Sequence, residues 1–69
     1  MNKKMVIDHL NDPSLGYIET SPGKWQKSHW PEMSYIIVDP INSDVAFCNG
    51  SDDNTIWNEI VQEFKITYS

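Results

Sequence analysis

The densest apolar stretch of the chain begins with Tyr35-Ile36-Ile37-Val38. β-Branched and aromatic residues fit a pleated, packed surface, so this run predicts a strand. Asp39-Pro40 ends the strand, because proline has no amide hydrogen for a ladder and presets a turn. A second apolar run, Val45-Ala46-Phe47-Cys48, follows the polar residues of the turn. Two apolar runs joined by a short polar loop predict a β-hairpin, and we expect this hairpin to lie at the centre of the fold.

Both faces of the first strand of this hairpin are apolar. Alternation along a strand places Tyr35 and Ile37 on one face and Ile36 and Val38 on the other. A sheet covered on one side only normally alternates apolar with polar residues. We therefore expect both faces to be covered. A helix should cover one face, and the N-terminal segment, the tryptophan segment of residues 24–33 or another molecule should cover the other.

The C-terminal part of the chain predicts an amphipathic helix. Its apolar residues recur at spacings that place all of them on one side of a helix: Ile56, Trp57, Ile60, Val61 and Phe64. Asp52 or Asp53 is expected to cap the N-terminus, where an acidic side chain suits the positive end of the helix dipole. Residues 66–68 are expected to fray or to add a short strand.

The N-terminal half predicts two more strands. Residues 15–20 read as one strand, and Ser21-Pro22-Gly23 is a strong turn signal. Residues 25–27 would then form the second strand of a hairpin, with Trp30-Pro31 in the loop that follows. Residues 3–11 fit either a helix or a short strand, and in either case Asp12-Pro13 ends the element.

These elements predict a single α+β domain over residues 1–69. We expect a small antiparallel sheet of three or four strands with one C-terminal helix packed on one face. A chain of this length buries roughly 60% of the surface that its unfolded form exposes, so its stability margin is small. The single cysteine excludes an intrachain disulfide, and a second copy of the chain is a common alternative source of burial.

The charge balance narrows the classes of partner. The chain carries ten acidic residues, five lysines and no arginine, for a formal charge of −5. Binding to double-stranded nucleic acid depends on phosphate neutralisation by lysine and arginine, so we do not expect it here. An anionic membrane surface is disfavoured for the same reason, whereas a basic protein partner is compatible. The sequence shows neither a signal peptide nor a membrane span, and one free cysteine fits a reducing, cytoplasmic location.

Candidate catalytic and metal-ligating groups are sparse. Cys48 is the possible nucleophile, with His9 and His29 as possible bases, but a cysteine at the end of an apolar strand is usually a small buried hydrophobe. The same three residues lack the local spacing of a metal site. There is no phosphate-binding glycine loop. We therefore expect a protein that is not an enzyme and that holds no cofactor or metal.

The tryptophan segment and the acidic helix face are the candidate binding residues. Tryptophan is enriched at interface hot spots, and aromatic rings beside lysines can stack nucleic-acid bases. Alternatively, both rings cap the small core. Glu59 and Glu63 lie one helical turn apart and form either a solvated face or an acidic strip for a basic partner. The candidate partner-binding residues are Trp25, Trp30, Lys24, Lys27, His29, Glu59 and Glu63.

Three functional hypotheses follow from these features. The first is a non-enzymatic, small acidic protein-binding module, such as a phage or mobile-element inhibitor of a host enzyme or defence complex. The second is a self-associating structural protein that forms a homodimer through the apolar sheet face. The third is a weak single-stranded nucleic-acid binder that uses Trp25 and Trp30.

Overall fold

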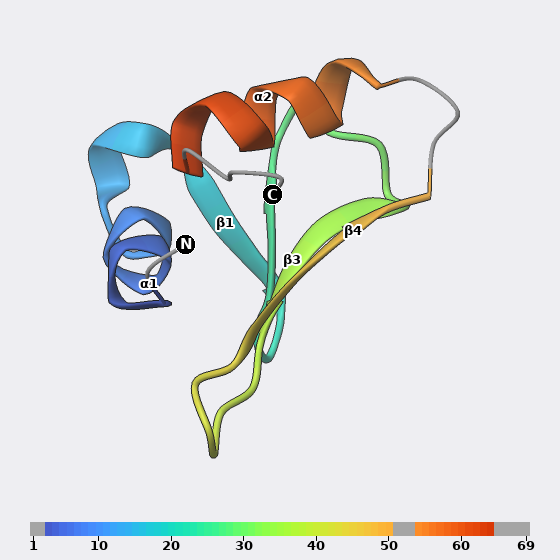
Figure 1. Ribbon diagram of the computed structural model, residues 1–69. Helices are drawn as coiled ribbons and strands as arrows, with labels where there is room; N and C mark the ends of the chain where they lie inside the picture. The colour runs from blue at the N-terminus through green and yellow to red at the C-terminus, as the bar shows by residue number, and fades with distance from the viewer. Residues whose placement is uncertain (1–2, 51–53, 65–69) are drawn as a thin grey trace, which may run out of the picture.

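The structure is a computed structural model that describes residues 3–50 and 54–64. The chain starts with a helix, passes through four strands and ends the described part with a second helix (Figure 1). In chain order the elements are α1 (Lys3–Leu10), the 3₁₀ turn η1 (Pro13–Leu15), β1 (Tyr17–Ser21), β2 (Lys24–Lys27), β3 (Ser34–Val38), β4 (Val45–Asn49) and α2 (Thr55–Phe64). The predicted α+β fold class is confirmed, and residues 3–10, which the sequence left open, form a helix.

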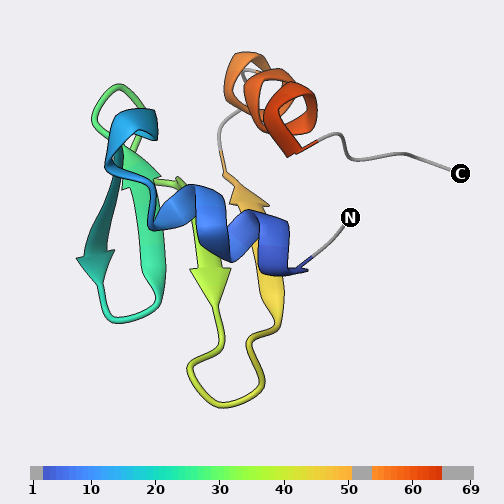
Figure 2. The same cartoon turned by 90° about the vertical axis from the view of Figure 1, so that its left-hand side faces the viewer.

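The four strands form one antiparallel sheet in the order β1-β2-β3-β4 (Figure 2). Both predicted hairpins are present. In the first, Ile18 pairs with Gln26, and in the second, Ile36 pairs with Phe47. The turn between β3 and β4 begins as the sequence predicts, because the Asp39 carboxylate accepts the backbone amide of Ile41 at 2.8 Å.

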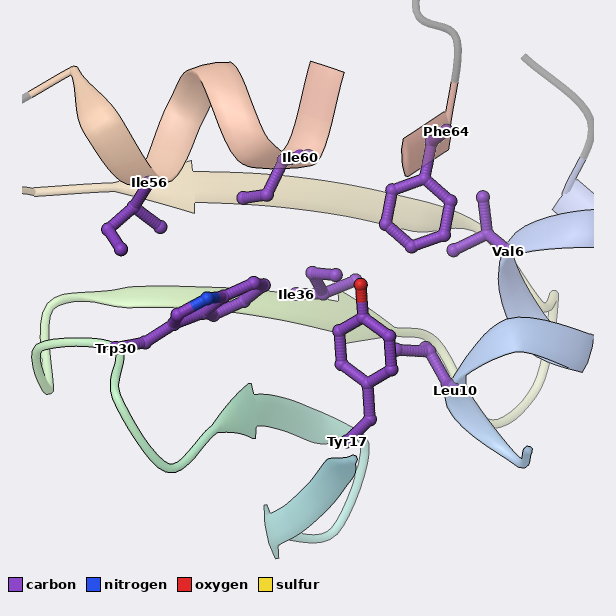
Figure 3. Close-up of a cluster of buried hydrophobic side chains, with 8 residues drawn as sticks. All are labelled: Val6, Leu10, Tyr17, Trp30, Ile36, Ile56, Ile60 and Phe64. Carbon is purple, nitrogen blue, oxygen red and sulfur yellow. The ribbon is translucent and has the colours of Figure 1, made fainter. Parts of the chain in front are cut away.

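Both helices pack on the same face of the sheet (Figure 1). One apolar core joins them to the strands and to the loop between β2 and β3 (Figure 3). Its buried members are Val6, Leu10, Tyr17, Trp30, Ile36, Ile56, Ile60 and Phe64. The spacing predicted for α2 is confirmed in part: three of its five apolar residues, Ile56, Ile60 and Phe64, are buried, and Trp57 and Val61 are half-buried.

The predicted helix cover is present on one face of β3, whereas cover of the second face by another molecule stays a prediction. Ile36 points into the core and is fully buried, whereas Ile37 on the opposite face is 40% exposed. α1 joins α2 on the core side because Val6 and Leu10 belong to the same apolar cluster as Ile36. Among the described residues, no element covers the second face, which we call the open face.

One close backbone approach fixes the position of the β1–β2 turn against β3. Gly23 has φ +78°, and a Cβ atom there would lie 2.7 Å from the carbonyl oxygen of Val38. The carbonyl of Gly23 accepts the amide of Val38 at 2.8 Å. Only glycine satisfies both the left-handed backbone and the missing space, so this residue sets how closely the two hairpins join.

The predictions for residues 51–53 and 65–69 lie outside the described residues. They comprise the capping of α2 by Asp52 or Asp53 and the fate of Ile66 to Tyr68. Within the described helix, the backbone amide of Asn58 donates to the carbonyl of Asn54 at 2.8 Å, so helical hydrogen bonding begins at the first described residue of this region.

Candidate functional site

Lys27 lies between two carboxylates of α2 and ties this helix to the sheet. Its Nζ atom is 3.4 Å from Oε2 of Glu63 and 3.7 Å from Oε1 of Glu59. It also lies 4.8 Å from the centroid of the Tyr17 ring, which provides a cation–π contact. The two carboxylates therefore do not form a free acidic strip on the helix, because a lysine of the sheet neutralises part of their charge.

Glu59 also receives the side chains of the β2–β3 loop. The imidazole Nε2 of His29 is 3.0 Å from Oε2 of Glu59, and the indole Nε1 of Trp30 donates to Oε1 at 3.4 Å. Partial burial opposes ionisation of this carboxyl, but these hydrogen bonds and the nearby charges of His29 and Lys27 outweigh it and lower the pKa of Glu59. The charged carboxylate is thus the form that the fold stabilises.

Glu63 accepts a hydrogen bond from the Tyr17 hydroxyl, which connects α2 to β1. Burial and this hydrogen bond both raise the pKa of Tyr17, because they favour the neutral phenol. The imidazole Nδ1 of His9 lies 3.9 Å from Oε1 of Glu63, so α1 also approaches the same carboxylate. The polar groups around Glu59 and Glu63 therefore join both helices, two strands and one loop. We call them the helix–sheet network.

Five of the seven predicted site residues belong to this network: Lys27, His29, Trp30, Glu59 and Glu63. The other two lie elsewhere. Trp25 is half-buried beside the core and lines a separate pocket of about 170 Å³ with Leu10 and Val38. Lys24 lies on the open face, where its Nζ atom is 4.6 Å from the ring centroid of Tyr35.

Trp30 is a core residue, with 7% of its surface exposed. Its ring packs edge-on against Tyr17, with 5.8 Å between centroids. A base that stacks on an aromatic side chain needs an accessible ring face, and Trp30 does not offer one. Of the two readings that the sequence left open for this ring, the structure therefore favours the core.

The open face is the uncovered apolar surface of the sheet. Ile18 and Ile37 are 51% and 40% exposed on it, and Met33 beside it is 61% exposed. The strand register places the following side chains on this face: Ile18, Thr20, Lys24, Gln26, Tyr35, Ile37, Ala46 and Cys48. This set contains one lysine and no carboxylate, although the whole chain carries ten acidic residues.

Gln26 folds the β2–β3 loop against one end of the open face. Its Nε2 amide lies 2.9 Å from the carbonyl oxygen of Ser34 and 3.2 Å from those of Pro31 and Glu32. Its Oε1 atom accepts the hydroxyl of Thr20 at 3.1 Å. The side chain is almost fully buried, and these hydrogen bonds satisfy its amide inside the fold.

The folded loop produces a pocket at this end of the open face. The pocket has a volume of about 280 Å³, and its lining includes Ile18, Gln26, Trp30 and Glu32. It therefore continues the apolar surface of β1, and its lining holds one carboxylate, that of Glu32, and one amine, that of Lys27.

Cys48 lies half-buried on the open face rather than in the core. Its partner is the Tyr35 hydroxyl, and this hydrogen bond is the main reason why the pKa of Tyr35 is raised. His9 and His29 lie away from it, because both histidines meet carboxylates of α2 on the other side of the sheet. The structure therefore does not bring together the cysteine–histidine pair that the sequence raised.

The described residues contain no cluster of three or more histidine, cysteine or acidic side chains that could hold a metal ion. None of the helices within them is long and apolar enough to cross a membrane. Comparisons with protein-family models, with curated proteins and with solved structures found no match. The geometry of the open face and of the helix–sheet network therefore carries the functional interpretation.

Sequence reasoning did not identify Ile18 and Gln26 as site residues. Alternation along β1 places Ile18 and Tyr17 on different faces of the sheet. Alternation along β3 does the same for Ile37 and Ile36. These signals show which residues share a face, but they do not show which face the helices leave open. No signal in the sequence pointed to Gln26, whose role depends on a loop conformation.

Proposed function

We propose that the protein is a non-enzymatic protein-binding module whose contact surface is the open face. The observation that carries this proposal is the exposure of Ile18 and Ile37 on a sheet face without a carboxylate, in a chain of net charge −5. On this face Gln26 and Lys24 of β2 lie between the two isoleucines, and apolar side chains among polar ones are typical of the contact surfaces of non-obligate complexes. An inhibitor of a host enzyme or defence complex, encoded by a phage or another mobile element, is one form of such a module.

The charges around the open face define the chemistry of the partner. Glu32 borders the pocket at one end, and Asp39 and Asp44 lie in the turn at the other end of β3 and β4. We therefore infer a partner with an apolar contact surface and a basic rim. Acidic groups at the rim accelerate association with such a partner, and salt should slow it.

The test compares three variants as bait for proteins from a cell lysate. Ile18→Lys and Ile37→Lys place a charge on the open face, whereas Ile41→Lys makes the same change at an 88% exposed residue of the β3–β4 turn. A basic protein that the wild type and Ile41→Lys retain, and that both open-face variants lose, supports the proposal. Equal retention by all four baits, or a partner insensitive to both open-face changes, refutes it. Circular dichroism confirms that each variant is folded.

A further inference from the structure

The two edges of the sheet differ in how they are protected against strand addition. The register of β1 shifts between Glu19 and Ser21, so this edge carries an irregularity. The β3–β4 register is continuous over five residue pairs, and β4 contains neither a charged residue nor a proline. Natural edge strands normally carry bulges, charges or prolines, because a regular edge is a template for another chain. By this criterion β4 is the less protected edge.

The register also shows which backbone groups of β4 point away from the sheet. The amide of Asp39 donates to the carbonyl of Asp44, and the amide of Gly50 donates to the carbonyl of Met33. Bonded pairs alternate along an antiparallel ladder, so Ala46 and Cys48 bond to β3. The amide and carbonyl of Val45 and Phe47 therefore point outward, and no other strand in the described parts of the chain pairs with them.

We propose that β4 pairs with β4 of a second copy of this chain, in an antiparallel arrangement whose two-fold axis passes between the two Ala46 residues. This register joins Val45 of each chain to Phe47 of the other through their outward backbone groups. It also places an aromatic side chain opposite a β-branched one on the helix side, which is a favourable cross-strand pair. The two four-stranded sheets become one sheet of eight strands.

A second copy fits this edge because the pairing is self-complementary in shape and charge. Ala46 is exposed and has a small side chain, so two copies can approach closely at the axis. Asp44 falls opposite Cys48 of the second copy, so the register opposes no two carboxylates despite the charge of −5 on each chain. On the helix side, the Trp57 ring contacts the Phe47 side chain, with 6.4 Å between centroids.

This interface is distinct from the contact surface of the proposed function. Pairing through the edge leaves Ile18 and Ile37 uncovered and places two open faces side by side in one extended sheet. A dimer would therefore offer two equivalent binding surfaces, and the loss of the dimer would reduce avidity without removing the surface itself.

Sedimentation velocity provides the first test. We expect the wild type to sediment as a dimer at concentrations on the order of 100 µM, and a strict monomer at that concentration overturns the proposal. Ala46→Asp and Ala46→Lys should each weaken the dimer by roughly 30-fold or more, because like charges then meet at the axis. An equimolar mixture of the two variants should restore it. A mixture that stays monomeric, or single variants that dimerise like the wild type, overturns the proposed register.

A thiol cross-link tests the same axis independently of affinity. In the variant Ala46→Cys with Cys48→Ser, the two new thiols face each other in a non-bonded pair, where Cα atoms lie about 4.5 Å apart and a disulfide can form. We expect rapid oxidation to a covalent dimer. The wild type, with its native Cys48, is the matched control, because that residue faces Asp44 of the second copy rather than its own counterpart. Equal cross-linking rates for the two proteins contradict the proposed pairing.

Discussion

Lys27 of β2 and Glu63 of α2 form an ion pair, with Nζ 3.4 Å from Oε2 and only 19% and 17% of the two side chains exposed. Glu59, one turn earlier on α2, shares the same lysine. A single sheet residue thus compensates two carboxylates of the helix that covers the core. The pair explains why an acidic helix face can lie against the edge of a small apolar core.

Lys27→Met should lower the free energy of unfolding by about 1–3 kcal/mol, between the values for exposed and buried ion pairs. The variant keeps an apolar stem but leaves Glu59 and Glu63 to repel each other. Lys3→Met is the matched control, because Lys3 pairs with Asp44 on the surface, where 57% and 61% of the side chains are exposed. It should cost less than about 0.5 kcal/mol. Urea unfolding followed by tryptophan fluorescence measures both, and equal costs would show that the network does not stabilise the helix.

Tyr17 makes the fold sensitive to alkali. Its pKa is raised in the folded protein, so the folded state holds the phenolic proton more tightly than the unfolded chain does. The resulting stability is complete below the ordinary value of 10.0 and is lost as the pH rises above it. We expect the free energy of unfolding to fall from about pH 10 upward, and Tyr17→Phe to remove most of that slope.

Tyr17→Phe should also lower stability at neutral pH by about 1.5–3 kcal/mol, because a hydrogen bond to the charged Glu63 is lost. Urea titrations followed by circular dichroism between pH 8 and 11 provide the measurement. Tyr35→Phe is the control on the open face. The pKa of Tyr35 is also raised, by its hydrogen bond with Cys48, but this side chain is less buried than Tyr17, so we expect the variant to lose a smaller part of the alkaline slope than Tyr17→Phe does. If Tyr35→Phe removed more of the alkaline fall in the free energy of unfolding than Tyr17→Phe, the assignment to Tyr17 would be contradicted.

Trp30→Ala should cost roughly 3–5 kcal/mol, because the indole ring is buried between Tyr17 and α2. A loss of this size is comparable with the whole stability of so small a domain, so we expect the variant to be largely unfolded at room temperature. Trp25→Ala removes a ring that is only half-buried and should cost less. Thermal melts by circular dichroism compare the two. A folded Trp30→Ala protein with the wild-type melting temperature would make this ring a binding anchor after all.

Gly23→Ala should be more destabilising than Gly16→Ala. Both glycines have positive φ, +78° and +80°, so both substitutions carry the cost of a left-handed backbone, about 1 kcal/mol. At Gly16 a Cβ atom meets nothing within 4 Å, whereas at Gly23 it would clash with the Val38 carbonyl. The difference between the two costs therefore measures the close approach of the β1–β2 turn to β3. Equal costs in urea unfolding would mean that the turn moves away without penalty.

The sequence predicted the elements because their signals are local. Alternation, turn residues and the spacing of the α2 apolar residues identified the β1–β2 and β3–β4 hairpins and the C-terminal helix. The α1 segment stayed open because its apolar residues, Met5, Val6, Ile7 and Leu10, fit either one face of a short helix or a short strand. Its helical state depends on the packing of Val6 and Leu10 against the core that the rest of the chain builds.

The candidate sites needed the tertiary structure. Lys27, His29, Glu59 and Glu63 were singled out as separate binding residues, but only the packing of α2 on the sheet makes them one network. The open face has the same origin, because both helices pack on one side of the sheet. The alternation of residues along a strand does not indicate which side that is. The sequence by itself determined which residues share a face and, except in α1, which segments are strands or helices, because those properties depend on near neighbours. The tertiary structure decided which face is buried, because that choice depends on contacts between residues far apart in the chain.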